Sequence, residues 1–255
     1  MWRLLVLLVA VGLYSCDDDN GSDVPVDNQL IVEAYVFAGE PVSHVKLSKV
    51  HSEGEAIPVP VSDATVKLSQ GGIEVNLAQN EEMPGWFHIE DSNVVFSGSE
   101  PIELSISALG RTYSSVTHFP ESISGLNISD STINVTAAIS SELLAILSWN
   151  PLPNAQAYAV FVRNLDWGSD NTISLSASSD SPFYAVHQGY SLQLFPDHFT
   201  HLGAYDLYVS AVNEEYMEMY SEISNPDLRG APSNIEGAWG VFTAFNGQSI
   251  SVSVE

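Results

Sequence analysis

Apolar residues alternate with polar ones along most of the chain, and this period of two constrains the fold more than any other feature of the sequence. Residues 64–79 read ATVKLSQGGIEVNLAQ, with an apolar side chain at every second position before and after Gly71-Gly72. Alternation places one set of side chains on one face of a β-strand, and a glycine pair between two such runs is typical of a hairpin turn. No segment has a convincing period of 3.6 residues. The sequence therefore predicts an all-β protein.

The first half of the alternating region fits one β-sandwich. Short strands bounded by glycine and proline turns follow one another from residue 29 to about Pro120, a rhythm expected for a sandwich of about seven strands. The pieces PVSDATVKL, PGWFHI and IELSISALGRTYSSVT resemble the transthyretin-like and carboxypeptidase-regulatory-like modules of envelope proteins, which are immunoglobulin-like sandwiches. The resemblance implies a domain that connects, spaces or presents other parts.

The second half carries different markers. LSWNPLPNAQAYAVFV and HLGAYDLYVSAVN resemble a fibronectin type III domain over residues 131–224. That resemblance makes Trp149 the core tryptophan, places Tyr158 on the third strand and makes Tyr205 a tyrosine corner, in which the hydroxyl bonds to the preceding backbone. We also expect Trp86 to lie in a core.

We therefore expect two tandem β-sandwich domains behind a short N-terminal attachment segment. The segments are a signal peptide (1–15), an acidic tether (16–28), an N-terminal sandwich (29–121), a polar linker (122–131) and a fibronectin type III-like sandwich with a C-terminal extension (132–255). In the last of these, residues 216–220 carry apolar groups on both faces of a presumed late strand, which indicates a buried strand or an interface.

An apolar run over residues 4–13 precedes Cys16, the sole cysteine of the chain. Ten helical residues rise about 15 Å, half the ~30 Å hydrocarbon core of a bilayer, so the run fits a secretory signal and not a spanning helix. Leu13-Tyr14-Ser15-Cys16 resembles the lipobox of bacterial lipoproteins, which implies that Cys16 is acylated. An ordinary signal peptide with a chance cysteine is the alternative. A catalytic thiolate needs an electropositive setting, and three aspartates follow Cys16 directly.

The acidic balance excludes one class of partner. The chain has 32 Asp+Glu against 7 Lys+Arg, a formal net charge of −25. Such a surface repels phosphate backbones, so no nucleic acid is expected as a partner. Solubility outside the cell is the simplest meaning of the charge, and calcium binding is an open alternative.

No catalytic or metal-binding constellation stands out, so neither an enzyme nor a cofactor is expected. The densest histidine cluster, Asp197-His198-Phe199-Thr200-His201, lacks the further ligands of a zinc site and reads as a loop or turn. DDDNGSD misplaces the glycine of a calcium loop and lacks its final glutamate. There is no GxSxG elbow, and the glutamates of residues 214–222 read as a solvated face rather than as a glycosidase pair.

The whole chain resembles domain-of-unknown-function family 4249, secreted lipoproteins of the Bacteroidetes. The resemblance rests on the acid-trailed cysteine, the opening VEAYVFAGEPV and the ending GVFTAFNG. It implies an outer-membrane lipoprotein, anchored through N-terminal acyl chains and encoded near TonB-dependent receptors. It also implies that Asp17, Asp18 and Asp19 form a signal for export to the cell surface, with a plain acidic spacer as the alternative.

Two functions from different classes follow. The first is a non-catalytic accessory or interaction module that acts alongside a TonB-dependent receptor. The second is a lipoprotein that binds a glycan or peptide and captures nutrients. Trp167, in the polar stretch NLDWGSDN, is the candidate ligand-binding residue, because an exposed tryptophan is a common anchor; it could equally fold back over its own sheet. A structural surface spacer is a third possibility.

Overall fold

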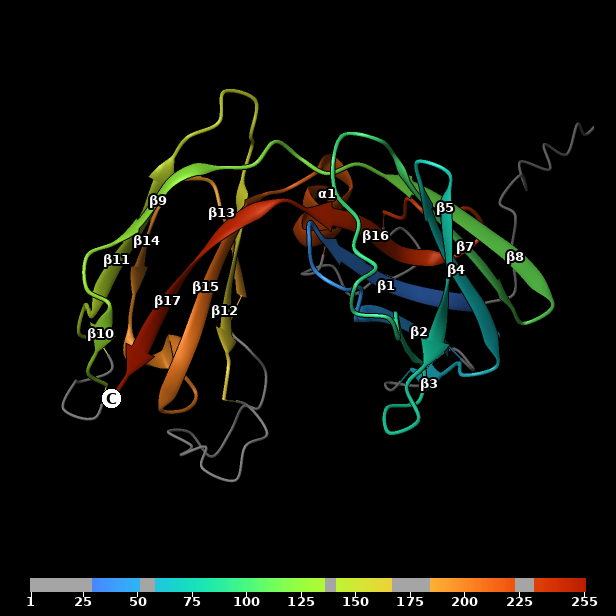
Figure 1. Ribbon diagram of the computed structural model, residues 1–255, viewed down its shortest axis with the longest axis horizontal. Coiled ribbons are helices and arrows are strands. Elements are labelled where there is room, and N and C mark those ends of the chain that lie inside the picture. Colours follow the sequence, from blue (N-terminus) through green and yellow to red (C-terminus); the bar gives the residue numbers. More distant parts are fainter. Residues whose placement is uncertain (1–28, 51–57, 136–140, 167–183, 223–231) are drawn as a thin grey trace, which may run out of the picture.

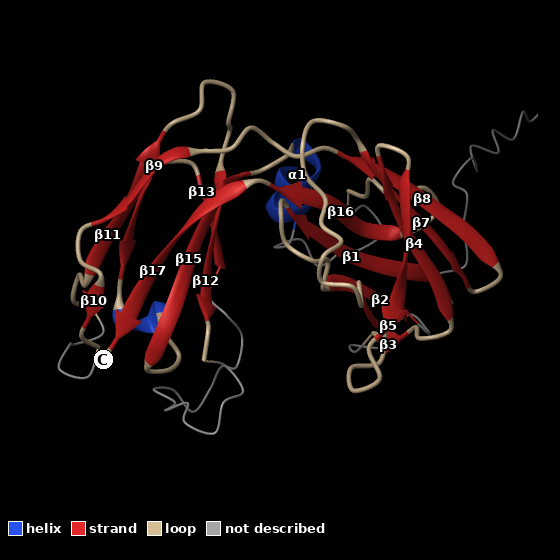
Figure 2. Ribbon diagram, in the orientation of Figure 1, coloured by secondary structure: helices blue, strands red, loops and turns tan. Residues whose placement is uncertain are grey.

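The computed structural model describes residues 29–50, 58–135, 141–166, 184–222 and 232–255, and strands dominate them (Figures 1 and 2). One continuous set of paired strands has the order β16 (Trp239–Phe245), β1 (Gln29–Phe37), β2 (His44–Val50), β6 (Trp86–His88), β5 (Ile73–Gln79), β4 (Ala64–Gln70), β7 (Ile102–Ala108) and β8 (Arg111–Thr117), and β3 (Val59–Pro60) pairs with β2. The all-β prediction is confirmed.

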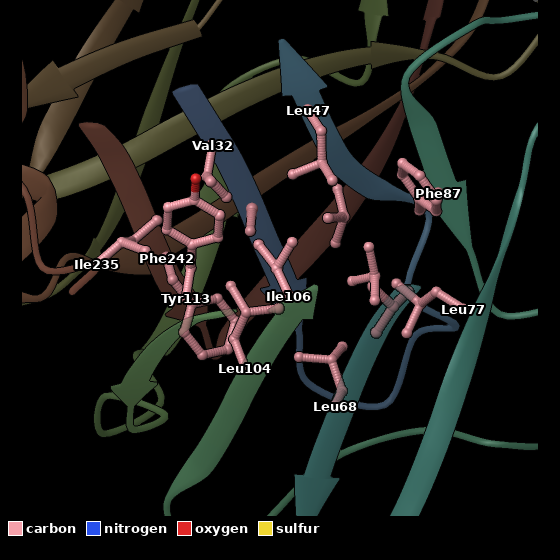
Figure 3. Packing of buried hydrophobic residues seen from close by; sticks show 14 of the residues in the cluster. Val32, Leu47, Leu68, Leu77, Phe87, Leu104, Ile106, Tyr113, Ile235 and Phe242 are labelled. Carbon is pink, nitrogen blue, oxygen red and sulfur yellow. The ribbon is translucent and has the colours of Figure 1, made fainter. Parts of the chain in front are cut away.

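This first sheet folds over itself to enclose a core. Figure 1 shows β4 and β5 crossing β1 and β2 at a steep angle. Buried apolar residues of these four strands belong to one core cluster. In Figure 3, Val32 and Phe242 from one layer face Leu104 and Ile106 from the other. All four are at most 1% exposed. The alternation in the sequence is therefore the alternation between this core and solvent.

Two further sheets form the second sandwich. The larger has the order β10 (Thr132–Ile133), β17 (Gly247–Val254), β15 (Gly203–Ala211), β12 (Tyr158–Asn164) and β13 (Tyr184–His187), and the smaller has the order β14 (Ser191–Leu194), β11 (Ala145–Asn150) and β9 (Ser124–Ile128). Leaving aside the two-residue β10, the smaller sheet holds the first, second and fifth strands of this half and the larger sheet holds the others, which is the arrangement of a fibronectin type III-like domain.

The aromatic markers of that domain lie where the sequence placed them. Trp149 is 3% exposed and packs edge-on against Tyr158, with ring centroids 5.3 Å apart. The Tyr205 hydroxyl donates to the His201 carbonyl at 2.8 Å and accepts from the His201 amide at 3.0 Å. This is a tyrosine corner, which ties the β15 strand to the loop before it.

The C-terminus differs from the prediction that it extends the second sandwich. Strand β16 pairs in parallel with β1, in register from Ile31↔Trp239 to Phe37↔Phe245, and so belongs to the first sandwich. Only β17 joins the second. The apolar run of β16 is buried on both faces, and a run without alternation does not reveal which sheet it enters.

Two other local predictions are wrong. The stretch proposed as a linker, 122–131, contains strand β9, an edge strand whose mostly exposed residues make it look like a polar connection. The presumed late strand is helix α1 (Glu214–Glu222). The Asn213 carbonyl accepts from the amides of Tyr216 and Met217, and Glu214 and Glu215 place negative charge in the first turn, where the helix dipole favours it.

Candidate functional site at the junction of the two sandwiches

The residues singled out from the sequence lie outside the described part of the chain. Cys16, Asp17, Asp18, Asp19 and Trp167 all fall in the segments 1–28 and 167–183, so their roles stay predictions. Within the described ranges, no helix has the length and apolarity needed to cross a membrane.

The two histidines of the cluster at residues 197–201 have structural positions. His198 ends the short helix η1 (Pro196–His198), burial lowers its pKa, and its Nε2 lies 3.9 Å from Asp197 Oδ1. His201 is 7% exposed, and its backbone makes the tyrosine corner with Tyr205. In the residues that the structure covers, no group of three or more His, Cys, Asp or Glu side chains is placed to hold a metal ion.

Trp86 differs from its prediction as a core residue. Strand β6 has three residues, and the middle one, Phe87, points into the core, which leaves Trp86 half-buried on the outer face of the sheet. The Lys46 ammonium lies over its ring, 5.8 Å from the centroid, and pairs with Glu33 at 2.9 Å. The indole is therefore occupied by a neighbouring cation.

A third apolar cluster joins the two sandwiches, and we call it the junction core. It contains Phe37, Ala157, Ala159, Tyr208, Val212, Tyr216 and Phe245, with Tyr35, Phe161, Val186 and Met217 packed against it. Phe37 comes from β1 of the first sandwich and Tyr208 from β15 of the second, and their centroids are 5.5 Å apart. Phe245 stacks on Phe37 at 5.1 Å. The two sandwiches thus share a desolvated aromatic interior.

Arg163 closes one side of the junction core. Its guanidinium carbon lies 4.4 Å from the ring centroid of Phe37 and 4.6 Å from that of Tyr208. Its Nη1 donates to both carboxylate oxygens of Glu40, at 2.9 and 3.1 Å. Because Glu40 belongs to the first sandwich and Arg163 to β12 of the second, this ion pair crosses the junction. A ring from each sandwich and the Glu40 carboxylate fix the cation in a single place.

Two titratable groups beside Arg163, His44 and Tyr208, have shifted pKa values. Desolvation by the surrounding protein, then the charge of Arg163, lowers the pKa of His44, although part of the residue is exposed to solvent, while Glu40 raises it by less. Burial raises the pKa of Tyr208 to about 12, and its hydroxyl accepts a hydrogen bond from the Gly247 amide at 2.7 Å. Both groups are therefore neutral near pH 7, so neither adds a charge beside the Arg163–Glu40 ion pair.

Helix α1 contributes polar contacts to the other side of the junction. Its Glu215 carboxylate accepts from the hydroxyls of Thr117 on β8, at 2.7 Å, and Thr243 on β16, at 3.2 Å. The side-chain amide of Asn213, just before the helix, donates to the His118 carbonyl at 2.7 Å. These contacts attach the chain after β15 to the first sandwich. The Glu215 carboxylate, which the sequence suggested was solvated, is therefore hydrogen-bonded within the protein.

A pocket of about 250 Å³ opens beside α1. Three segments surround it: residues 120–121 after β8, residues 152–156 between β11 and β12, and residues 211–217 from β15 into α1. None of these residues was a candidate from the sequence. They are far apart along the chain and carry no motif, so only the docking of the two sandwiches could reveal them.

Comparison with known proteins gives a family and no activity. A family model described as "Domain of unknown function (DUF4249)" matches residues 18–251. No curated protein is significantly similar to the chain. Among solved structures, one of a cytokine receptor complex is 9% identical with a TM-score of 0.27, covering 87% of this chain and 95% of that one. Another, of the FN1–FN3 domains of chicken CNTN1, is 12% identical with a TM-score of 0.25, covering 89% of this chain and 65% of that one.

Proposed function

The chain belongs to the family described as domain of unknown function 4249, and from that premise we propose that it is a lipid-anchored outer-membrane lipoprotein. In this proposal Cys16 carries the acyl chains, Asp17 to Asp19 direct export to the cell surface, and the paired sandwiches form a non-catalytic interaction module beside a TonB-dependent receptor. The sequence around Cys16 and the resemblance to the family support the anchor and the location.

The observation that supports an interaction module is the junction core. Aromatic side chains of both sandwiches pack together, and the Arg163–Glu40 ion pair crosses between them. The charged groups there hold one sandwich against the other: Arg163 contacts a ring from each sandwich, and Glu215 accepts from threonine hydroxyls. A pair of sandwiches in a fixed relation presents its surface loops in a fixed geometry, which favours recognition by loops on a rigid scaffold.

The anchor is tested with Cys16→Ser in the full-length protein. Acyl chains contribute about 0.8 kcal/mol per buried CH₂, and more than one chain makes attachment stable. We expect the variant to leave the membrane fraction, while Ser15→Ala, which preserves the cysteine, stays in it. Equal retention of Cys16→Ser and the unaltered protein would show that the anchor is assigned wrongly.

The location and the partner need separate measurements. Surface exposure predicts that antibody labels the protein on intact cells, and full protection there would place it inside. Affinity isolation in mild detergent should recover a TonB-dependent receptor with the lipoprotein, and isolation of the lipoprotein alone would oppose the accessory role.

The nutrient-capture alternative makes its own prediction about Trp167. Binding to a glycan array that disappears in Trp167→Ala would favour capture over the accessory role. Trp86→Ala is the matched control, since Lys46 already covers that indole.

A further inference from the structure

The pocket beside α1 has the size of a single side chain. Its volume of about 250 Å³ falls below the ~300–1,000 Å³ of pockets that enclose drug-sized ligands. It is therefore too small for an oligosaccharide, although one extended side chain can enter it.

Hydrogen bonds on all three sides hold the pocket open. The Val212 amide donates to the Ala157 carbonyl at 3.1 Å, and the Leu152 amide donates to the Tyr158 hydroxyl at 2.7 Å. On the third side, the Asn246 side chain donates to the Pro120 carbonyl at 2.9 Å. A cavity whose walls are tied in this way needs little reorganisation to accept a ligand.

The lining combines apolar residues and negative charge with the side-chain amides of Asn154, Gln156 and Asn213. Ala211 and Val212 are buried and Met217 is half-buried, whereas Glu121 and Glu214 are exposed. The lining contains no lysine, arginine or histidine and no aromatic ring among the described residues. A lysine or arginine side chain matches this pattern, because its methylene stem packs on apolar surface while its cationic head stays near water and carboxylates.

We propose that this junction pocket binds a lysine or arginine side chain presented by a partner protein. Charge complementarity extends beyond the pocket, since the chain has a formal net charge of −25 and attracts basic surfaces from a distance. A sugar would find no ring to stack on, and an anionic ligand would meet two carboxylates. The inference rests on the proposed role as an interaction module and names the chemistry of its partner.

Methionine methyl groups provide a direct assay. The chain has four methionines; Met217 lines the pocket, and Met83 is 47% exposed next to Glu81 and Glu82. The full-length protein, labelled with ¹³C at the methionine methyls and held in a mild zwitterionic detergent, is titrated with blocked tripeptides whose central residue is lysine, arginine, norleucine or glutamate. We expect the lysine and arginine peptides to shift the Met217 signal to saturation and to leave Met83 unchanged.

Charge-neutral variants identify the site. Exposed ion pairs alter affinity by roughly 1.5- to 5-fold each, so Glu121→Gln with Glu214→Gln should weaken binding by roughly 2- to 25-fold. The matched control, Glu81→Gln with Glu82→Gln, removes the same charge elsewhere and should leave the affinity unchanged.

Four results would overturn the proposal: no binding of the lysine and arginine peptides, equal shifts of Met83 and Met217, equal binding of the norleucine peptide, or a Met217 shift with monosaccharides and none with basic peptides. These outcomes are independent of the anchor. If the unaltered protein stays in the membrane fraction but binds no basic peptide, the pocket alone is refuted. If Cys16→Ser stays in the membrane fraction as the unaltered protein does, the anchor alone is refuted.

Discussion

Replacing Arg163 by methionine tests whether the junction holds the two sandwiches together. The substitution keeps an apolar stem of similar length but removes the contacts with Phe37 and Tyr208, at 4.4 and 4.6 Å, and the ion pair with Glu40 at 2.9 Å. The Arg163 side chain is 27% exposed and that of Glu40 is 41% exposed, so solvent screens the pair in part. The change therefore isolates the charged contacts of the junction from its apolar packing.

The magnitude follows from these contacts. Each contact of the cation with a ring contributes about 0.5–1 kcal/mol at a partly exposed site, and the ion pair about 0.2–1 kcal/mol. One effect has the opposite sign. Arg163 Nη2 is buried with no hydrogen-bond partner among the described residues, and removing such a donor raises the free energy of unfolding by about 1 kcal/mol. Together these terms predict that Arg163→Met lowers the free energy of unfolding by about 0.2–2 kcal/mol, with about 1 kcal/mol at the middle of that range.

Urea unfolding of a double-mutant cycle measures the pairwise part. Arg163→Met combined with Glu40→Gln should give a coupling energy of about 0.5–1 kcal/mol. The matched control is Lys67→Met with Glu74→Gln, an ion pair of 2.8 Å within one hairpin whose side chains are 40% and 59% exposed. A coupling no larger than that of the control, with a single-variant cost below about 0.2 kcal/mol, would refute the reasoning.

Three further predictions concern the fold around the junction. Tyr205→Phe removes both hydrogen bonds to the His201 backbone and should cost about 1–3 kcal/mol in urea unfolding, because a buried amide and carbonyl lose their partner; an unchanged midpoint would contradict the corner. Gly240→Ala should abolish folding or lower the melting temperature sharply, because Gly240 has φ +109° and an added Cβ would collide with the Val32 carbonyl; wild-type melting would contradict the β1–β16 pairing. The free energy of unfolding should decrease slightly as the pH falls below about 6.5, because desolvation and Arg163 lower the pKa of the partly exposed His44 from its ordinary 6.5 and the unfolded chain then binds the proton more readily. Melting curves at pH 7.5 and 5.5 test this, and His44→Gln should reduce the difference.

The strand-level features of this protein were predictable because they depend on local patterns. Alternation in residues 64–79 predicted the β4–β5 hairpin, and the Gly71-Gly72 turn lies where that pattern places it. Trp149, Tyr158 and Tyr205 marked the fibronectin type III-like half, since each has a fixed part in that fold. Helix α1 was missed because nine residues with acids interspersed among aromatic side chains satisfy a strand pattern as well as a helical one.

The sequence by itself determined the all-β class, the tyrosine corner and the family, because strand periodicity and short motifs are local properties of the chain. Only the tertiary structure decided that β16 returns to pair with β1, that Arg163 meets Phe37 and Glu40, and that a pocket opens beside α1. The physical reason is that β16 is buried on both faces. Apart from Thr243 such a strand has no polar side chain to mark an outer face, and its partner is chosen by the packing of two domains, which no local period records.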